Sequence, residues 1–253
     1  MDVLEEIKDK KEFRGLSDEL VLKVINIYRS KYNIEVEKER KMLVKDCRAK
    51  LRELYSAFRL GGYEKRIKYL SQMKNWYDED TAKKILSLHL SSKERLNYYP
   101  KLYKKLRSKI QFKTVLDIGC GMNVFSMPWM GRVDYYGIDV NKEDVDFCND
   151  YLNKFKITGG VRCADIMSLD NVIKTDVCFI FKVLEGLEGI ERNITTKLFV
   201  KITSPWIVVS FATRSLGGGK VISARRLKWF EELVKIEEKF NLGTEVYYII
   251  KNY

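Results

Sequence analysis

The first 110 residues carry hydrophobic positions at the spacing of amphipathic helices. In the stretch SDELVLKVINIYRSKY, Leu20, Val24 and Ile27 recur every three or four residues, and Ser17 stands before an acidic first turn as an N-cap. Further helical patterns cover residues 35–60, 63–73, 78–90 and 92–110, the last with Ser91 or Ser92 as its expected cap. These patterns predict an all-helical N-terminal part.

The pattern over residues 35–60 has two stripes. Its apolar stripe predicts a buried face and consists of Leu43, Cys47, Leu51, Leu54 and Phe58. Its basic stripe steps by three and four residues and consists of Lys38, Lys41, Lys45, Arg48 and Arg52. The pair Gly61-Gly62 is expected to end this helix.

From Thr114 onward, short β-rich runs alternate with helical segments. The runs cover residues 114–119, 134–140, 160–166, 175–181 and 206–212, and helical candidates lie around residues 142–154 and 187–201. Strands that alternate with helices predict a parallel sheet covered on both faces. Two alternating runs at residues 234–240 and 244–252 follow, joined by a turn, and predict a final antiparallel hairpin. We therefore expect an α/β fold with a seven-stranded sheet.

Charge divides the chain into two parts. Of the net charge of +12, residues 1–110 contribute 28 Lys and Arg against 17 Asp and Glu, and residues 111–253 contribute 19 against 18. This asymmetry favours a polyanionic partner such as nucleic acid, although solvated helix faces are an alternative. We expect a basic helical RNA-binding domain over residues 1–90 and a second domain over residues 91–253.

Composition excludes several classes of protein. No apolar run approaches the length of a membrane span, and the charged start MDVLEEIKDKKEF resembles no signal peptide. The five cysteines form no C-x-x-C pair, and His89 is the single histidine, so we expect no metal site. We expect a cytoplasmic monomer with reduced thiols, which does not enter the membrane.

The stretch TVLDIGCGMNVFSMPWM, residues 114–130, joins a strand to a Gly-rich loop. Gly119 and Gly121 can take positive φ and let a ligand approach the backbone, next to a helix N-terminus. A dinucleotide fingerprint needs a third glycine where Val124 stands, and a P-loop needs a G-K-[ST] that is absent. We interpret the segment MNVFSMPWM as core packing behind the loop.

Two acidic residues follow at the ends of the next two β runs. Asp139 lies 22 residues after Asp117 and is placed to accept the hydroxyls of a ribose. Asp165 could accept an adenine amino group while Ile166 offers its backbone. Each aspartate alone could instead be a helix cap or a turn residue. Together with the loop and the hairpin, they predict a nucleoside site without a pyrophosphate, as in a Rossmann-like class I S-adenosyl-L-methionine (SAM) methyltransferase.

Several longer motifs are specific to one family. The stretches ERLNYY, TVLDIGCGMNVFSMPWM, FIFKVLEGLE and VVSFATRSLGG, together with LYSAF and YEKRIKYL, resemble the Arm/Rmt (FmrO) family. Its members are aminoglycoside-resistance 16S rRNA (guanine-N7) methyltransferases. The resemblance covers most of the chain from about Leu51 onward. It implies a SAM cofactor, 16S rRNA in the small (30S) ribosomal subunit as partner, and methylation of guanine N7 in the decoding-site region.

The resemblance also implies a set of site residues. Arg95 matches the arginine that pairs with the SAM carboxylate, and the remaining cofactor residues are Gly119, Cys120, Gly121, Asp139, Val140, Asp165, Ile166 and Phe181. Residues that position the target base are Lys182, Phe211 and Arg214. Apart from the resemblance, the need to stack the base makes Tyr98 another candidate. The expected RNA-binding residues on the N-terminal helices are Lys41, Lys45, Arg48, Arg52, Lys65 and Arg66.

The chemistry of guanine N7 fits this set, since N7 is a neutral nitrogen with a free lone pair. It needs no general base, and the rate comes from in-line alignment. One departure stands out, because Ala212 replaces the proline that the family usually has in its S-F-P loop. Two alternatives remain open: an RNA methyltransferase of the same fold acting on another rRNA or tRNA position such as adenine N1, and a catalytically silent RNA-binding assembly factor.

Overall fold

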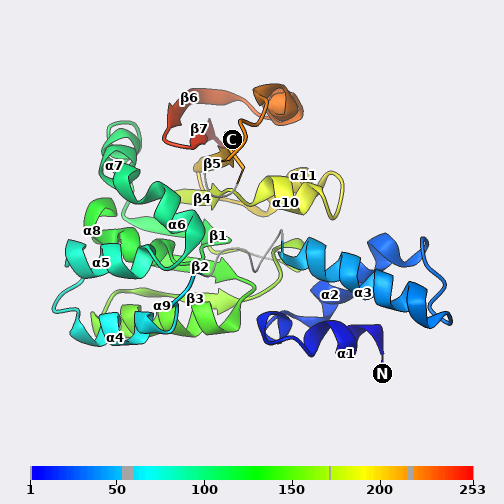
Figure 1. The fold of residues 1–253 in the computed structure, drawn as a ribbon. Helices are drawn as coiled ribbons and strands as arrows, with labels where there is room; N and C mark the ends of the chain where they lie inside the picture. Colours follow the sequence, from blue (N-terminus) through cyan, green and yellow to red (C-terminus); the bar gives the residue numbers. More distant parts are fainter. Residues whose placement is uncertain (1, 53–59, 171, 216–218, 253) are drawn as a thin grey trace.

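The computed structural model describes residues 2–52, 60–170, 172–215 and 219–252. Its centre is a seven-stranded sheet in the order β3-β2-β1-β4-β5-β7-β6 (Figure 1). The strands are β1 (Thr114–Ile118), β2 (Asp134–Asp139), β3 (Gly159–Cys163), β4 (Val177–Phe181), β5 (Trp206–Ala212), β6 (Ile236–Leu242) and β7 (Glu245–Lys251).

Five strands are parallel and the last two form the hairpin. β1 pairs with β2 on one side and with β4 on the other, so the strand order reverses at β1. β7 lies antiparallel between β5 and β6, with Trp206 opposite Lys251 in the register. The predicted class I methyltransferase fold is therefore confirmed, and ligands bind such sheets at the carboxyl ends beside the reversal point.

Helices cover both faces of the sheet because neighbouring residues of each buried strand point to opposite sides. In β4, Val177 and Phe179 join one hydrophobic cluster, whereas Cys178 and Ile180 join the other. The first cluster includes residues of α4 (Lys65–Gln72), α5 (Glu79–Leu86), α7 (Tyr99–Arg107), α8 (Met127–Met130) and α9 (Lys142–Lys154). The second includes residues of α10 (Leu184–Glu188), α11 (Ile194–Lys201) and α12 (Lys228–Leu233).

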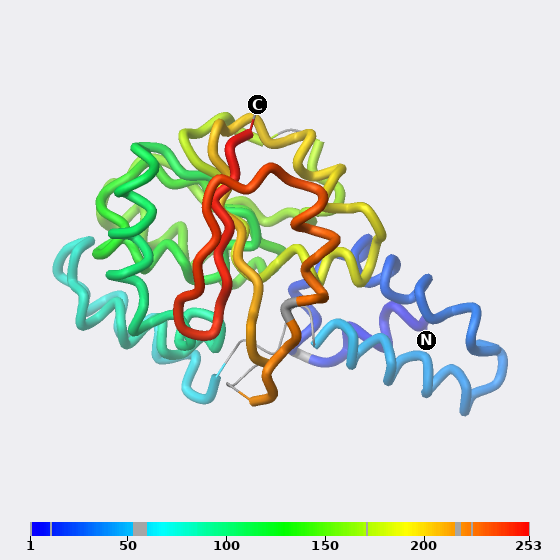
Figure 2. The backbone as a smooth tube through the Cα atoms, turned by 90° about the horizontal axis from the view of Figure 1, so that it is seen from above, coloured from blue at the N-terminus to red at the C-terminus, as the bar shows by residue number. Residues whose placement is uncertain are grey.

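The first three helices form a lobe to one side of the sheet, shown in blue in Figures 1 and 2. They are α1 (Val3–Lys8), α2 (Asp18–Arg29) and α3 (Glu37–Leu51). As predicted, Ser17 caps α2 by accepting from the Leu20 amide at 3.3 Å. The predicted stripe residues Leu43, Cys47 and Leu51 are buried, whereas Leu54 and Phe58 lie outside the described residues.

The two halves of the predicted N-terminal domain pack in different places. α1 to α3 contribute to the cluster that contains α10 and α11, whereas α4 and α5 contribute to the opposite cluster with α7 and α9. α5 also contacts the 3₁₀ helix η4 (Asn123–Ser126) behind the Gly-rich loop. That residues 1–90 act as one RNA-binding unit remains a prediction.

Two predicted helices are broken. The pattern over residues 92–110 forms α6 (Leu90–Arg95) and then α7, because Pro100 has no amide hydrogen and begins a new helix instead of continuing one. The residue before α6 is His89, so the predicted caps Ser91 and Ser92 are wrong. The predicted helix over residues 187–201 is interrupted at Asn193, whose φ of 65° is left-handed.

The segment MNVFSMPWM packs as predicted. Val124, Phe125, Met127 and Met130 are fully buried beneath the Gly-rich loop. Among the described residues, no helix has the length and hydropathy needed to cross a lipid bilayer.

Candidate active site

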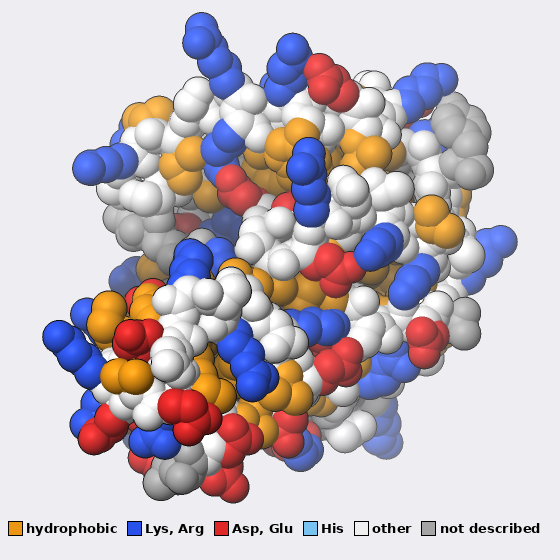
Figure 3. All heavy atoms as spheres, turned by 90° about the vertical axis from the view of Figure 1, so that its right-hand side faces the viewer, with side chains coloured by type: hydrophobic (Ala, Val, Ile, Leu, Met, Phe, Trp, Pro, Cys, Tyr) orange, Lys and Arg blue, Asp and Glu red, His pale blue; other side chains and the backbone are white. Residues whose placement is uncertain are grey.

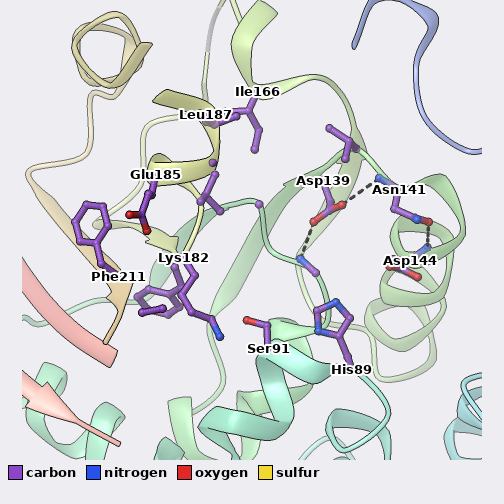
Figure 4. A pocket seen from close by; sticks show the side chains of 17 residues that line it. His89, Ser91, Asp139, Asn141, Asp144, Ile166, Lys182, Glu185, Leu187 and Phe211 are labelled. Carbon is purple, nitrogen blue, oxygen red and sulfur yellow. Dashed lines mark hydrogen bonds between the residues drawn. The ribbon is translucent and has the colours of Figure 1, made fainter. Parts of the chain in front are cut away.

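A cavity of about 350 Å³ opens at the carboxyl ends of the parallel strands. Residues line it from the Gly-rich loop after β1, from the ends of β2, β4 and β5 or the segments after them, from the segment after β3 and from the start of α6, and Figure 4 labels several of them. This is the edge at which the strand order reverses, and the volume lies in the range of small-molecule sites. The position is the one that the sequence predicted for a nucleoside.

The Gly-rich loop forms one wall of the cavity with a backbone that only glycine adopts easily. Gly119 and Gly121 have φ of 71° and 47° and both line the cavity. A Cβ on Gly119 would lie 2.4 Å from Cγ2 of Val183, which also lines the cavity. The loop therefore gives a ligand close access to the main chain, and it leaves no room for a side chain at Gly119.

Asp117 supports this loop from beneath and does not line the cavity. Its carboxylate accepts from the Tyr135 hydroxyl at 2.6 Å and from the Asn123 side-chain amide at 2.7 Å. Burial raises the pKa of Asp117 to about 6, because the charged form is poorly solvated there. The residue ties β1, β2 and η4 together below the site.

Asp139 presents its carboxylate at the cavity, at the end of β2. Its oxygens accept from the Gly121 amide at 2.8 Å and from the Asn141 amide at 3.0 Å (Figure 4). Burial, followed by the nearby Asp144, raises the pKa of Asp139 to about 6. A carboxylate fixed by backbone amides beside a glycine loop suits the hydroxyls of a ribose.

The residues after β3 divide between the cavity and the lobe. Ile166 lines the cavity, as does Leu187 of α10. Asp165 is buried outside it, where its carboxylate accepts from the Met167 amide at 3.0 Å and from Nζ of Lys23 at 3.1 Å. Because both oxygens are engaged, an adenine contact by Asp165 remains a prediction. Cys120 is also buried and does not line the cavity, whereas Val140 and Phe181 do.

Arg95 lies behind the cavity in an ion pair that the sequence did not indicate. Its guanidinium donates to both oxygens of Glu245 at 3.1 and 3.0 Å, and also to the Tyr247 hydroxyl at 3.2 Å. The arginine is only 4% exposed and stacks over the Phe181 ring at 4.9 Å. Pairing of Arg95 with a SAM carboxylate remains a prediction, since here its partner is Glu245.

Lys182 belongs to the same charged cluster and does reach the cavity. Its Nζ lies 2.7 Å from Glu94 and 3.9 Å from Glu245, with the side chain pointing toward Ser91 in Figure 4. Its φ of 60° is unusual for a residue with a side chain, and such strain gathers at functional sites. Burial would raise the pKa of Glu245, but Arg95 and Lys182 outweigh it and hold that pKa below its usual value.

The predicted base-stacking residues differ in their placement. Phe211 lines the cavity but packs against Phe230, with ring centroids 4.8 Å apart, so much of its surface is already covered. Arg214 is exposed and does not line the cavity. Tyr98 is half-buried and packs against Gly243 in the hairpin turn. A stacking role for Arg214 or Tyr98 remains a prediction.

Sequence reasoning did not single out other residues of the cavity. His89 and Ser91 reach it from α6, and Glu185 reaches it from α10. Glu185 forms an ion pair with Arg226, which also donates to the Ala212 carbonyl at 2.5 Å. The motifs HLSSKERL and FKVLEGLE contain these residues, but nothing in their spacing distinguished them from helix-surface positions.

The expected RNA-binding residues are only partly available to a partner. Lys41 pairs with Glu37 at 2.6 Å and Arg52 with Glu12 at 2.6 Å, while Arg48 donates to the Glu6 carbonyl. Arg66 is buried, with its guanidinium over the Tyr63 ring. This guanidinium is therefore poorly exposed for the expected contact with RNA. Lys45 and Lys65 are exposed.

Positive charge is concentrated outside the N-terminal lobe. Residues 1–52 contain 14 Lys and Arg against 11 Asp and Glu, whereas residues 60–110 contain 13 against 5. Figure 3 shows the lobe in the lower part of the view, with both signs of charge mixed over its surface. The helices α4 to α7 therefore carry most of the basic excess that the sequence indicated.

Comparisons with known proteins match most of the chain, including the residues that line the cavity. The sequence model of a family described as ribosomal RNA methyltransferase (FmrO) matches residues 37–236. A protein of Serratia marcescens named 16S rRNA (guanine(1405)-N(7))-methyltransferase is 34% identical over 175 residues, which cover 67% of this chain and 70% of that protein.

Solved structures show the same architecture. The 16S rRNA methylase RmtB is 26% identical and superposes with a TM-score of 0.80, covering 100% of this chain and 98% of RmtB. The 16S rRNA methyltransferase RmtF, solved in complex with S-adenosyl-L-homocysteine, gives a TM-score of 0.86 at 24% identity, with all of both chains covered.

Proposed function

Because the chain belongs to the FmrO family of ribosomal RNA methyltransferases, we propose that it methylates N7 of a guanine in 16S rRNA, with SAM as methyl donor. The observation that carries the proposal is the cavity at the carboxyl edge of the sheet, with Asp139 and the Gly-rich loop at one end and Lys182 at the other. The family match spans this whole region.

The cavity suits the cofactor in size and in chemistry. SAM, when bound, supplies a methyl group on a positively charged sulfonium. Asp139 is placed to accept the ribose hydroxyls, and Gly119 and Gly121 admit a ligand against their backbone. Ile166 and Leu187 offer apolar walls to a flat adenine ring. The apolar parts of the cavity exclude water from these contacts.

The acceptor side of the proposed site lies at the ends of β4 and β5. Lys182 carries its ammonium group to the cavity, and an ammonium donor can hold guanine through its O6 acceptor and leave the lone pair of N7 free for the methyl group. Adenine presents a donor amino group in place of O6, so Lys182 favours guanine. Because N7 needs no deprotonation, Lys182 and Phe211 act by holding the base in line with the methyl group.

The proposed partner is 16S rRNA in the small ribosomal subunit. The net charge of +12 and the basic helices α4 to α7 support binding to phosphates. An enzyme with this substrate works where ribosomal subunits are assembled, so we infer a cytoplasmic location. Methylation in the decoding region would confer aminoglycoside resistance, which a host expressing the chain would show as a raised inhibitory concentration.

The test incubates the protein with labelled SAM and purified small subunits, with naked 16S rRNA in parallel, and maps products by borohydride and aniline cleavage. This chemistry cuts RNA at N7-methylguanine. We expect label in 16S rRNA and one cut in the decoding region, both absent with the Asp139→Ala variant. Label without a cut would move the methyl group to another atom, and no label on either substrate would contradict the proposed activity.

A further inference from the structure

One contact joins the N-terminal lobe to the wall of the cavity. Nζ of Lys23, on α2, lies 3.1 Å from Asp165 and 3.2 Å from Glu19 of its own helix. Lys23 and Asp165 are 142 residues apart in the chain. The carboxylate of Asp165 is 3% exposed and the lysine side chain 28%, so the pair is far better shielded than a surface salt bridge.

Asp165 in turn organises the short turn that forms the wall. It caps the 3₁₀ helix η5 (Ile166–Ser168) through the Met167 amide at 3.0 Å, and its carbonyl accepts from the Ser168 amide at 3.2 Å. Ile166, the next residue, lines the cavity, as does Leu187 (Figure 4). The orientation of Ile166 therefore depends on a carboxylate that α2 holds from outside.

Apolar packing connects the same elements. Leu20 and Val24 of α2 belong to the hydrophobic cluster that contains Met167 and Leu169, the residues around the end of η5. On the other side, Lys201 of α11 donates to the Leu169 carbonyl. The turn is thus held between α2 and α11, and Lys23 supplies a charged contact to it from the lobe.

We propose that Lys23 is a positioning residue for the cofactor, which acts through Asp165 and η5 to hold Ile166 against the nucleoside. This proposal rests on the proposed function, because it takes the ligand of the cavity to be SAM. It assigns to the lobe a second task besides RNA contact: it completes the nucleoside half of the cofactor site from a helix that does not line the cavity.

The test measures binding of S-adenosyl-L-homocysteine to the full chain by calorimetry, for the native protein and for Lys23→Met, Lys23→Arg and Lys8→Met. Lys8→Met is a matched control, since Lys8 is 25% exposed and pairs with Asp18 inside the lobe. We expect Lys23→Met to weaken binding roughly five-fold, while Lys23→Arg and Lys8→Met stay near the native affinity.

A second ligand locates the effect. Binding of 5′-methylthioadenosine, which has the nucleoside but no amino-acid carboxylate, is expected to weaken by the same factor in Lys23→Met. A loss of affinity for S-adenosyl-L-homocysteine alone would place the effect at the amino-acid part of the ligand and overturn the proposal. So would equal losses in Lys23→Met and Lys8→Met, which would show general loosening of the lobe. Failure of the native protein to bind either ligand would contradict the proposed function itself.

Discussion

At the scale of single residues, the candidate site depends on a carboxylate that ionises near neutral pH. Asp139 accepts hydrogen bonds from two backbone amides, yet burial and Asp144 raise its pKa to about 6. The amides favour the charged form, and the loss of solvent disfavours it. Only the ionised form can accept both ribose hydroxyls, so protonation competes directly with the proposed ligand.

We therefore expect the affinity for S-adenosyl-L-homocysteine to fall as the pH is lowered through 6. The sign follows from the raised pKa: Asp139 is ionised above 6 and protonated below it. Between pH 7.5 and pH 5, calorimetry should show a loss of about ten-fold in the native protein. In Asp139→Asn the affinity should be weaker and flat over this range. If the variant keeps the pH dependence, Asp117 and not Asp139 controls it.

A second prediction at the scale of single residues concerns the stability cost of a side chain at Gly119. Gly119→Ala adds a Cβ at a φ of 71° and 2.4 Å from Val183, so both the backbone and the packing are strained. We expect urea unfolding to show a loss of about 1–3 kcal/mol. Val183→Ala in the same chain should recover the steric part. Gly160→Ala is the control, because its nearest neighbour would lie at 3.7 Å. Equal losses of stability in Gly119→Ala and Gly160→Ala would contradict the idea that the φ of Gly119 and its contact with Val183 cause the loss.

At the scale of elements, a buried charge cluster joins α6 to β4 and β7. Arg95 and Glu94 come from α6, Lys182 follows β4, and Glu245 begins β7. Ser210 of β5 donates to Glu245 at 2.6 Å, so four elements meet at one carboxylate. The cluster fixes the helix that carries His89 and Ser91 to the cavity, and it sets the position of Lys182 at the acceptor side.

Removing one partner of such a pair leaves an uncompensated buried charge. We expect Arg95→Met to lower the free energy of unfolding by about 3–5 kcal/mol, measured with urea. The double variant Arg95→Met with Glu245→Gln should recover much of that loss. Lys105→Met, which breaks a more exposed pair with Glu238, should cost far less. Unchanged stability combined with lost affinity for S-adenosyl-L-homocysteine would instead favour the role that the family resemblance gives to Arg95.

At the scale of the whole molecule, many of the basic side chains already form ion pairs with acidic side chains of the same chain. Several basic side chains of α3 are held by the acidic residues of the lobe itself, as with Lys41 and Glu37. Lys45 is exposed on the same helix. A Lys or Arg side chain that binds a phosphate releases counterions from the RNA. The slope of log affinity against log salt therefore measures how many of these side chains contact phosphates.

We expect Lys45→Ala to weaken binding to small subunits several-fold and to reduce the slope of log affinity against log salt by about one. Affinity for S-adenosyl-L-homocysteine should not change. Lys109→Ala is a suitable control, since Lys109 pairs with Glu238 at 3.4 Å. It lies just before the amino end of β1, whereas the cavity is at the carboxyl ends of the parallel strands. Binding to subunits can be measured by filtration over a salt series. An equal change of slope in both variants would show that Lys45 acts only through net charge.

Much of the architecture could be predicted from the sequence because it depends on local patterns. The alternation of apolar runs and helical stripes predicted all seven strands and several of the helices, and glycine adopts the positive φ of Gly119 and Gly121 more easily than any other residue. The breaks at Pro100 and Asn193 were missed, since a helical stripe continues across them. Asp139 was predicted because a strand end followed by a carboxylate is a local signal.

The partners of the charged residues were decided only by the tertiary structure. Arg95 pairs with Glu245 and Lys23 pairs with Asp165 across separations that no spacing in the chain encodes. The physical reason is that burial raises the energy of an unpaired charge, so each such group adopts the partner that packing brings to it. The sequence by itself determined which residue types stand at the cavity edge, and packing decided which of them face the ligand and which support it from behind.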